Sequence, residues 1–89
     1  MDQPLTFEQF QTIFSEYLGI DTIKLTKDVN LLFELGVDSL SLVNVMLRLE
    51  KEYQVAFKAE DRVMTRTLGE AYDLFTKYKS LGGQAQVGN

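Results

Sequence analysis

The sequence predicts a small all-α protein: three main helices and one short helix in a bundle, with a long loop after the first helix. Apolar residues recur at steps of three and four in segments 6–18, 39–53 and 68–78. Residues that cap helices open each of these segments. No strand pattern competes, because Val55-Ala56-Phe57 is too short to start a sheet.

The first helix is expected at about residues 6–18, where Thr6 and Gln9 form a capping box. Residues 20–38 then mix isolated apolar residues with Thr, Lys and Asp, which is typical of a long structured loop. Such a loop needs anchoring, and we expect a helical turn near residues 30–34. We expect its apolar residues to pin the loop to the core: Leu31, Leu32, Phe33 and Leu35.

Residues 39–53 form the predicted central helix, and Asp38 is its N-cap. Residues 58–64 are expected to form one or two helical turns. A second capping box, made by Thr67 and Glu70, opens the final helix. The predicted order is therefore two long helices, one short helix and a final long helix, which suits a small bundle.

The length and composition indicate one domain, since 89 residues with 45% hydrophobic and 25% charged side chains suit a single small core. We expect this domain at residues 1–80 and a flexible tail at residues 81–89, which are small and polar. Met1 favours a free-standing protein, whereas Gly82-Gly83 also suits a linker, so both alternatives stay open.

The charge pattern and the termini restrict location and partners. The N-terminus lacks the basic region and apolar run of a signal peptide, and no apolar run is long enough to span a membrane. A net charge of −4 without a Lys/Arg cluster argues against binding to nucleic acids and anionic membranes. We therefore expect a cytoplasmic monomer whose partners are proteins with basic patches.

Cysteine and histidine are both absent, which excludes disulfides, thiolate or imidazole metal ligands, a cysteine nucleophile and the usual general base. The 13 Asp and Glu residues are scattered over helical segments, where exposure to solvent explains them. We predict neither a metal site nor an enzymatic activity.

The most informative segment is Leu-Gly-Val-Asp-Ser-Leu at residues 35–40. Gly36 permits a sharp turn, Asp38 caps the helix, and Ser39 takes the first helical position. The unpaired N–H groups and the helix dipole at that position favour a phosphate on the serine. The plainer alternative is that Asp38 and Ser39 only cap a helix.

This segment, with the helix behind it, resembles the acyl carrier protein family, whose signature Gly-x-Asp-Ser-Leu opens the second helix of a four-helix bundle. The resemblance covers residues 6–80. It implies that a phosphopantetheinyl transferase attaches 4'-phosphopantetheine from coenzyme A to Ser39, in a site that includes Gly36 and Asp38. The arm then carries acyl groups as thioesters. A substrate protein needs no base of its own, which suits the absence of histidine.

The central helix carries two apolar stripes. We expect the first stripe to be core: Leu42, Val45, Met46, Leu49 and Tyr53. The second stripe, Leu40, Val43 and Leu47, adjoins Ser39, and members of the carrier family dock partner enzymes on such residues. The alternative is that a central helix buries both stripes against its neighbours.

The charges of this helix bear on the pathway, because Arg48 and Lys51 balance Glu50 and Glu52. Many fatty-acid carriers are intensely acidic there, so the resemblance leans towards carriers of polyketide assembly lines. Acyltransferases, ketosynthases or other assembly-line enzymes are then the expected partners. Fatty-acid and peptidyl carriers remain alternatives.

Two alternatives lie outside the carrier family. Asp38-Ser39-Leu40 superficially resembles an esterase motif, but Val37 breaks its spacing and no histidine is present to act as base. The stronger rival is a helical interaction module, in which the second stripe binds a partner helix and Ser39 is only a cap residue.

Overall fold

The computed structural model describes the backbone of residues 5–87 and the side chains of residues 5–79. Its α-helices follow the predicted order: α1 (Phe7–Leu18), α2 (Ser39–Tyr53), α3 (Ala59–Met64) and α4 (Leu68–Val87). The long loop also contains a single-turn 3-10 helix, η1 (Thr22–Lys24), which the sequence pattern did not predict. Over residues 5–87 there is no strand, and one isolated bridge joins Asn30 to Thr67. The all-α prediction with a long first loop and a short third helix is confirmed.

Local capping explains where the long helices begin. The Thr6 hydroxyl accepts from the N–H of Gln9 at 3.1 Å, and the Gln9 side chain accepts from the N–H of Thr6 at 2.8 Å. Thr67 and Glu70 repeat this reciprocal pair ahead of α4, at 3.1 and 3.2 Å. Both predicted capping boxes are therefore present, and each satisfies two N–H groups that a helix end leaves unpaired.

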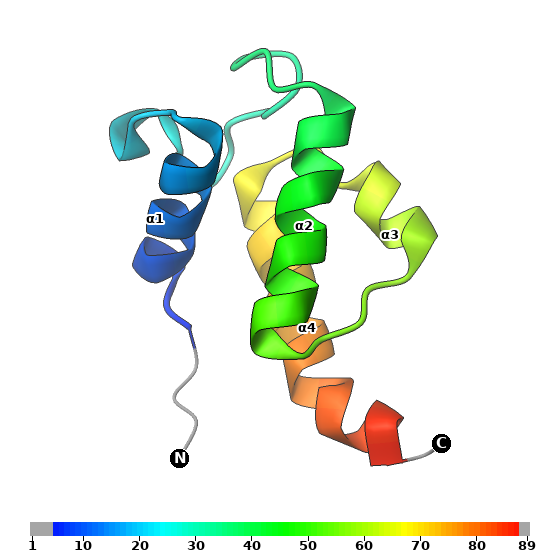
Figure 1. The fold of residues 1–89 in the computed structure, drawn as a ribbon. Coiled ribbons are helices and arrows are strands. Elements are labelled where there is room, and N and C mark those ends of the chain that lie inside the picture. The colour runs from blue at the N-terminus through cyan, green and yellow to red at the C-terminus, as the bar shows by residue number, and fades with distance from the viewer. Residues whose placement is uncertain (1–4, 88–89) are drawn as a thin grey trace.

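The core lies where α1, α2 and α4 meet. Figure 1 shows α2 between α1 and α3, with α4 running behind it, and α2 contacts both α1 and α3. Aromatic rings fill the centre: Phe10 lies 4.8 Å from Phe14 and 5.7 Å from Phe75, between ring centroids. Rings bury large apolar areas, so this cluster is a major source of stability in a small domain. The first stripe of α2 joins it through four buried residues, Leu42, Val45, Met46 and Leu49, and a half-buried Tyr53.

The long loop is fastened to the start of α4 by backbone hydrogen bonds. Leu31 donates to the carbonyl of Arg66 at 2.8 Å, and Gly69 donates to the carbonyl of Lys27 at 2.8 Å. The Leu31 side chain is completely buried. Two chain segments far apart in sequence are thus held together next to the entrance of α2.

The prediction that Phe33 helps to anchor the long loop is wrong. Leu31 is buried, and Leu32 and Leu35 pack against the core, but Phe33 is 83% exposed. The reason is the turn itself: Asn30 Oδ1 accepts from the N–H groups of Leu32 and Phe33, at 3.0 and 2.8 Å. This turn directs Leu31 inward, and a turn cannot bury all of its successive side chains on one side.

The last helix is longer than the periodicity indicated, since α4 continues through Gly82 and Gly83 to Val87. It therefore enters the segment 81–89 that we expected to be a flexible tail, of which residues 88–89 lie outside the described residues. The division into a domain at residues 1–80 and a flexible tail stays a prediction. None of the helices in the described range is long and apolar enough to cross a membrane.

Candidate functional site

The chain enters α2 through a left-handed glycine. Gly36 has φ +71°, a backbone conformation that residues with a Cβ rarely adopt. Val37 is then tied back to the loop, since its N–H donates to the carbonyl of Leu31 at 2.9 Å and its side chain is buried. The turn therefore delivers the next two residues to the surface, and both Asp38 and Ser39 are exposed.

Asp38 is the N-cap of α2, as predicted. Its carboxylate accepts from the N–H of Ser41 at 3.0 Å, and its carbonyl accepts from the N–H of Leu42 at 3.1 Å. Ser39 is the first residue of the helix. Helical geometry leaves the N–H groups of Ser39 and Leu40 without partners inside the helix, and they point out at its positive end. An anionic phosphate on the Ser39 hydroxyl would therefore meet favourable electrostatics.

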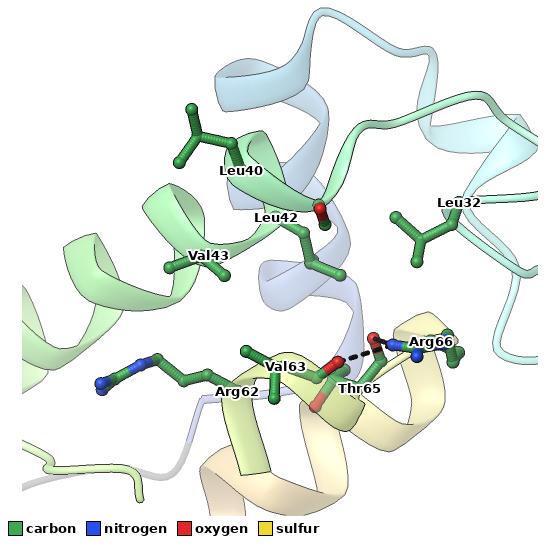
Figure 2. A pocket seen from close by; sticks show the side chains of 9 residues that line it. Leu32, Leu40, Leu42, Val43, Arg62, Val63, Thr65 and Arg66 are labelled. Atoms are coloured by element: carbon green, nitrogen blue, oxygen red, sulfur yellow. Dashed lines mark hydrogen bonds between the residues drawn. The ribbon is translucent and has the colours of Figure 1, made fainter. Parts of the chain in front are cut away.

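A cleft of about 490 Å³ opens beside Ser39. Figure 2 shows Leu42 and Val43 of α2 on one side, Val63 of α3 and Thr65 beyond it on the other, and Leu32 of the long loop at one end. Its lining is mainly apolar with two arginines near the α3 side: Leu32, Ser39, Leu40, Leu42, Val43, Arg62, Val63, Thr65 and Arg66. The site thus combines an exposed hydroxyl, a helix N-terminus and a mainly apolar cleft, which fits a phosphate linked to a mostly uncharged arm.

The two arginines of the cleft differ in their partners. Arg62 forms an ion pair with Glu50 at 2.7 Å, and the same carboxylate oxygen accepts from the N–H of Phe57 at 2.6 Å. Arg66 instead donates to the carbonyls of Val63 and Thr65. Arg62 is thus a structural tie between α2 and α3, whereas Arg66 keeps its charge uncompensated by any carboxylate within the described residues.

The second stripe of α2 is not part of the core. Leu40 is 68% exposed, Leu47 is 42% exposed, and Val43 is half-buried where it lines the cleft. The alternative in which the central helix buries both stripes is therefore wrong. The role of the second stripe in docking partner enzymes stays a prediction, because exposure alone does not identify the protein that would bind there.

Several residues near Ser39 were missed by the sequence reasoning. Val63 of α3 is 58% exposed and lines the cleft, and Arg66, in the connection to α4, lines it as well. A helix of six residues is too short for its apolar spacing to assign an inner and an outer face, so no signal in the sequence placed these side chains beside α2. Among the described residues, no group of three or more acidic side chains is arranged to hold a metal ion.

Comparison with known proteins bears directly on this site. The family model described as "Phosphopantetheine attachment site" matches residues 8–82. An acyl carrier protein from Guillardia theta is 32% identical over 77 residues, which cover 86% of this chain and 95% of that relative. These matches confirm the predicted prosthetic group, a covalently attached 4'-phosphopantetheine, and a protein that carries rather than catalyses. The chain therefore belongs to the family of phosphopantetheine-binding acyl carrier proteins.

Proposed function

We propose that Ser39 is the residue that bears the 4'-phosphopantetheine arm, and that the protein presents acyl thioesters on this arm to partner enzymes. The observation that carries the proposal is the position of Ser39, exposed at the first residue of α2 and on the rim of the apolar cleft. Ser41 is the nearest competing hydroxyl in the sequence of α2, but it is half-buried, whereas Ser39 is exposed. Ser41 also lies within the first turn of the helix, where its N–H donates to the Asp38 carboxylate.

The attachment reaction asks little of this chain. The Ser39 oxygen forms a new bond to the phosphorus of coenzyme A that carries the pantetheine. The bond from that phosphorus to the bridging oxygen breaks, and adenosine 3',5'-bisphosphate leaves with this oxygen. Since the chain has no histidine, the hydroxyl proton passes to a base of the transferase. Once attached, the arm supplies the thiol that a chain without cysteine lacks. Gly36 and Asp38 act here by holding Ser39 at the surface.

Intact mass after incubation with coenzyme A, magnesium and a broad-specificity phosphopantetheinyl transferase tests this assignment. We expect one arm on the unaltered protein and none on Ser39→Ala. The matched control is Ser41→Ala, two positions further along the same helix, which should load as the unaltered protein does. Loading of Ser39→Ala would refute Ser39 as the attachment point, and failure of all three with several transferases would favour the helical interaction module.

We further infer that the pathway is polyketide or related specialised biosynthesis, with acyltransferases and ketosynthases as partners. The support is the charge on α2, where Arg48 pairs with Glu52 at 2.9 Å and Arg62 pairs with Glu50 at 2.7 Å. Neutralised carboxylates exert a weak long-range field, so basic partner patches would steer towards α2 less than towards an acidic helix. A monomeric state and a cytoplasmic location belong to the same proposal.

Transfer kinetics separate this pathway from its alternatives. We expect acyltransferases of polyketide type to acylate the loaded protein faster than those of fatty-acid type, with a rate that changes little with ionic strength. A strong preference for the fatty-acid enzymes, or for aminoacyl transfer by an adenylation enzyme, would move the assignment to a fatty-acid or peptidyl carrier respectively.

A further inference from the structure

Arg66 differs from the other two arginines of the chain in having no acidic partner. Arg48 pairs with Glu52 at 2.9 Å, and Arg62 pairs with Glu50 at 2.7 Å. No carboxylate among the described side chains lies within ion-pair distance of the Arg66 guanidinium. Arg66 is exposed and lines the same cleft as Ser39, so its positive charge remains available to an anion there.

The Arg66 side chain is nevertheless held in place. Its Nη1 donates to the carbonyl of Val63 at 2.6 Å and to that of Thr65 at 3.4 Å. The neighbouring Glu70 carboxylate is occupied elsewhere, since it accepts from the backbone N–H groups of Arg66 and Thr67 at 2.9 and 3.2 Å. A guanidinium has donors on three nitrogens, so its Nε and Nη2 remain available for a further acceptor. Little additional ordering is then needed to bind one.

Arg66 and Ser39 line the same cleft. Figure 2 shows the guanidinium turned towards the carbonyls of Val63 and Thr65, on the wall that faces the start of α2. Any phosphodiester on Ser39 has its phosphorus one bond from the Ser39 oxygen, and therefore lies on the rim of this cleft. Its two free oxygens carry one negative charge in need of donors.

We propose that Arg66 binds the phosphodiester end of the arm and holds it against the cleft between α2 and α3. The proposal rests on Ser39 being the attachment residue. The unpaired N–H groups at the start of α2 donate to the diester from one side and the planar guanidinium donates from the other, the pairing that arginine makes best with phosphate. Arg66 is thus a positioning residue for the arm, and its contact sets the direction in which the arm leaves Ser39.

The test compares apo and loaded forms of the full chain by NMR and by thermal unfolding. On loading, the side-chain Nε–H signal of Arg66 should shift and its exchange with water should slow severalfold. The Nε–H of Arg48, which lines a different cleft beside Tyr17, should not change. The melting temperature should rise on loading, and Arg66→Gln should lose most of that rise. Arg48→Gln is the matched control and should retain it.

Using the difference between loaded and apo forms of each variant keeps the test independent of folding effects, because Arg66→Gln also removes the hydrogen bonds to Val63 and Thr65. Loaded protein in which the Arg66 signal and the rise in melting temperature are indistinguishable from those of the Arg48 control would overturn the proposal and leave the carrier assignment intact. Absence of any mass gain on the unaltered protein would instead remove the attachment at Ser39, and this proposal with it.

Discussion

Gly36 is the residue on which the presentation of Ser39 depends most directly. Its φ of +71° turns the loop into the Asp38 cap, and a Cβ added there would meet no atom within 4 Å. The requirement for glycine is therefore one of backbone conformation and not of space. Gly19 has the same φ and the same open surroundings at the end of α1, so the chain contains its own matched control.

We predict that Gly36→Ala lowers the free energy of unfolding by about 1–2 kcal/mol, the cost of a left-handed conformation for a residue with a Cβ. Gly19→Ala should cost a similar amount. Only Gly36→Ala should also slow the attachment of phosphopantetheine, because it alone disturbs the approach to Ser39. Urea unfolding and initial rates of mass gain measure both effects. Equal loading rates in the two variants would contradict a specific role for Gly36.

At the scale of single elements, α2 serves two purposes on two faces. Its buried stripe closes the core, whereas Leu40 and Leu47 project from the opposite edge with 68% and 42% exposure. Leu40 also lines the cleft beside Ser39, so this exposed edge adjoins the surface along which the arm would lie (Figure 2). A partner that docks over this edge would meet apolar side chains immediately next to Ser39.

We expect Leu47→Ala to raise the KM of the transferase or of an acyltransferase severalfold while changing the stability by less than about 0.5 kcal/mol, as is usual for exposed positions. Leu42→Ala, on the buried stripe, is the comparison: it should cost about 2–5 kcal/mol through lost burial and a cavity. Steady-state kinetics and chemical denaturation report the two quantities. An unchanged KM for Leu47→Ala with every partner tested would argue against the docking edge.

A hydrogen bond from Tyr78 of α4 joins this helix to the short helix α3. Its hydroxyl donates to the Asp61 carboxylate at 2.6 Å, and its ring packs edge-on to Phe57 with centroids 5.6 Å apart. The hydrogen bond to Asp61, together with burial, raises the pKa of Tyr78 above its ordinary value of 10.0. Only the protonated phenol can donate this hydrogen bond, so the contact between α3 and α4 depends on pH in the alkaline range.

The sign of this linkage gives a prediction. Because the folded pKa of Tyr78 lies above the unfolded one, its contribution to stability is complete below about pH 10 and is lost as the pH rises through the folded value. Tyr78→Phe should remove that part of the alkaline decline, and Asp61→Asn should weaken it in the same range. Urea midpoints measured between neutral pH and pH 11 test this. Parallel curves for Tyr78→Phe and the unaltered protein would contradict it.

At the scale of the whole molecule, the long loop closes the fold over the start of α4. The bonds from Leu31 to the Arg66 carbonyl and from Gly69 to the Lys27 carbonyl join two regions that the chain separates by a long helix and a short one. Gly69 is packed so tightly that a Cβ there would lie 2.7 Å from the Lys27 side chain and 2.8 Å from its carbonyl. The cleft beside Ser39 depends on this closure, because it draws walls from the loop, α2 and α3.

We predict that Leu31→Ala lowers the free energy of unfolding by about 2–5 kcal/mol, since its side chain is completely buried. Phe33→Ala, two positions away in the same turn, should leave stability nearly unchanged because the ring is 83% exposed. Thermal unfolding of the two variants measures the contrast. Similar losses for both would mean that the loop packs differently in solution.

Local signals in the sequence determined the helices and the identity of the family. Capping boxes and helical periodicity are interactions within a few residues, so the start of each long helix followed from the chain itself. The same holds for the segment at residues 35–40, whose glycine, cap and serine act on neighbouring backbone. The extension of α4 to Val87 went beyond these signals, since glycines usually disfavour helix.

Only the tertiary structure decided which apolar and charged side chains stay in contact with solvent. Leu31 and Phe33 belong to the same apolar run of the sequence, which gives no sign that they differ in burial. The turn at Asn30 is what buries Leu31 and exposes Phe33. The exposure of the second stripe depended on how much of α2 is covered by α3. Arg66 became part of the site because the loop and the start of α4 meet beside α2. Burial and ion pairing depend on neighbours distant in sequence, which periodicity cannot supply.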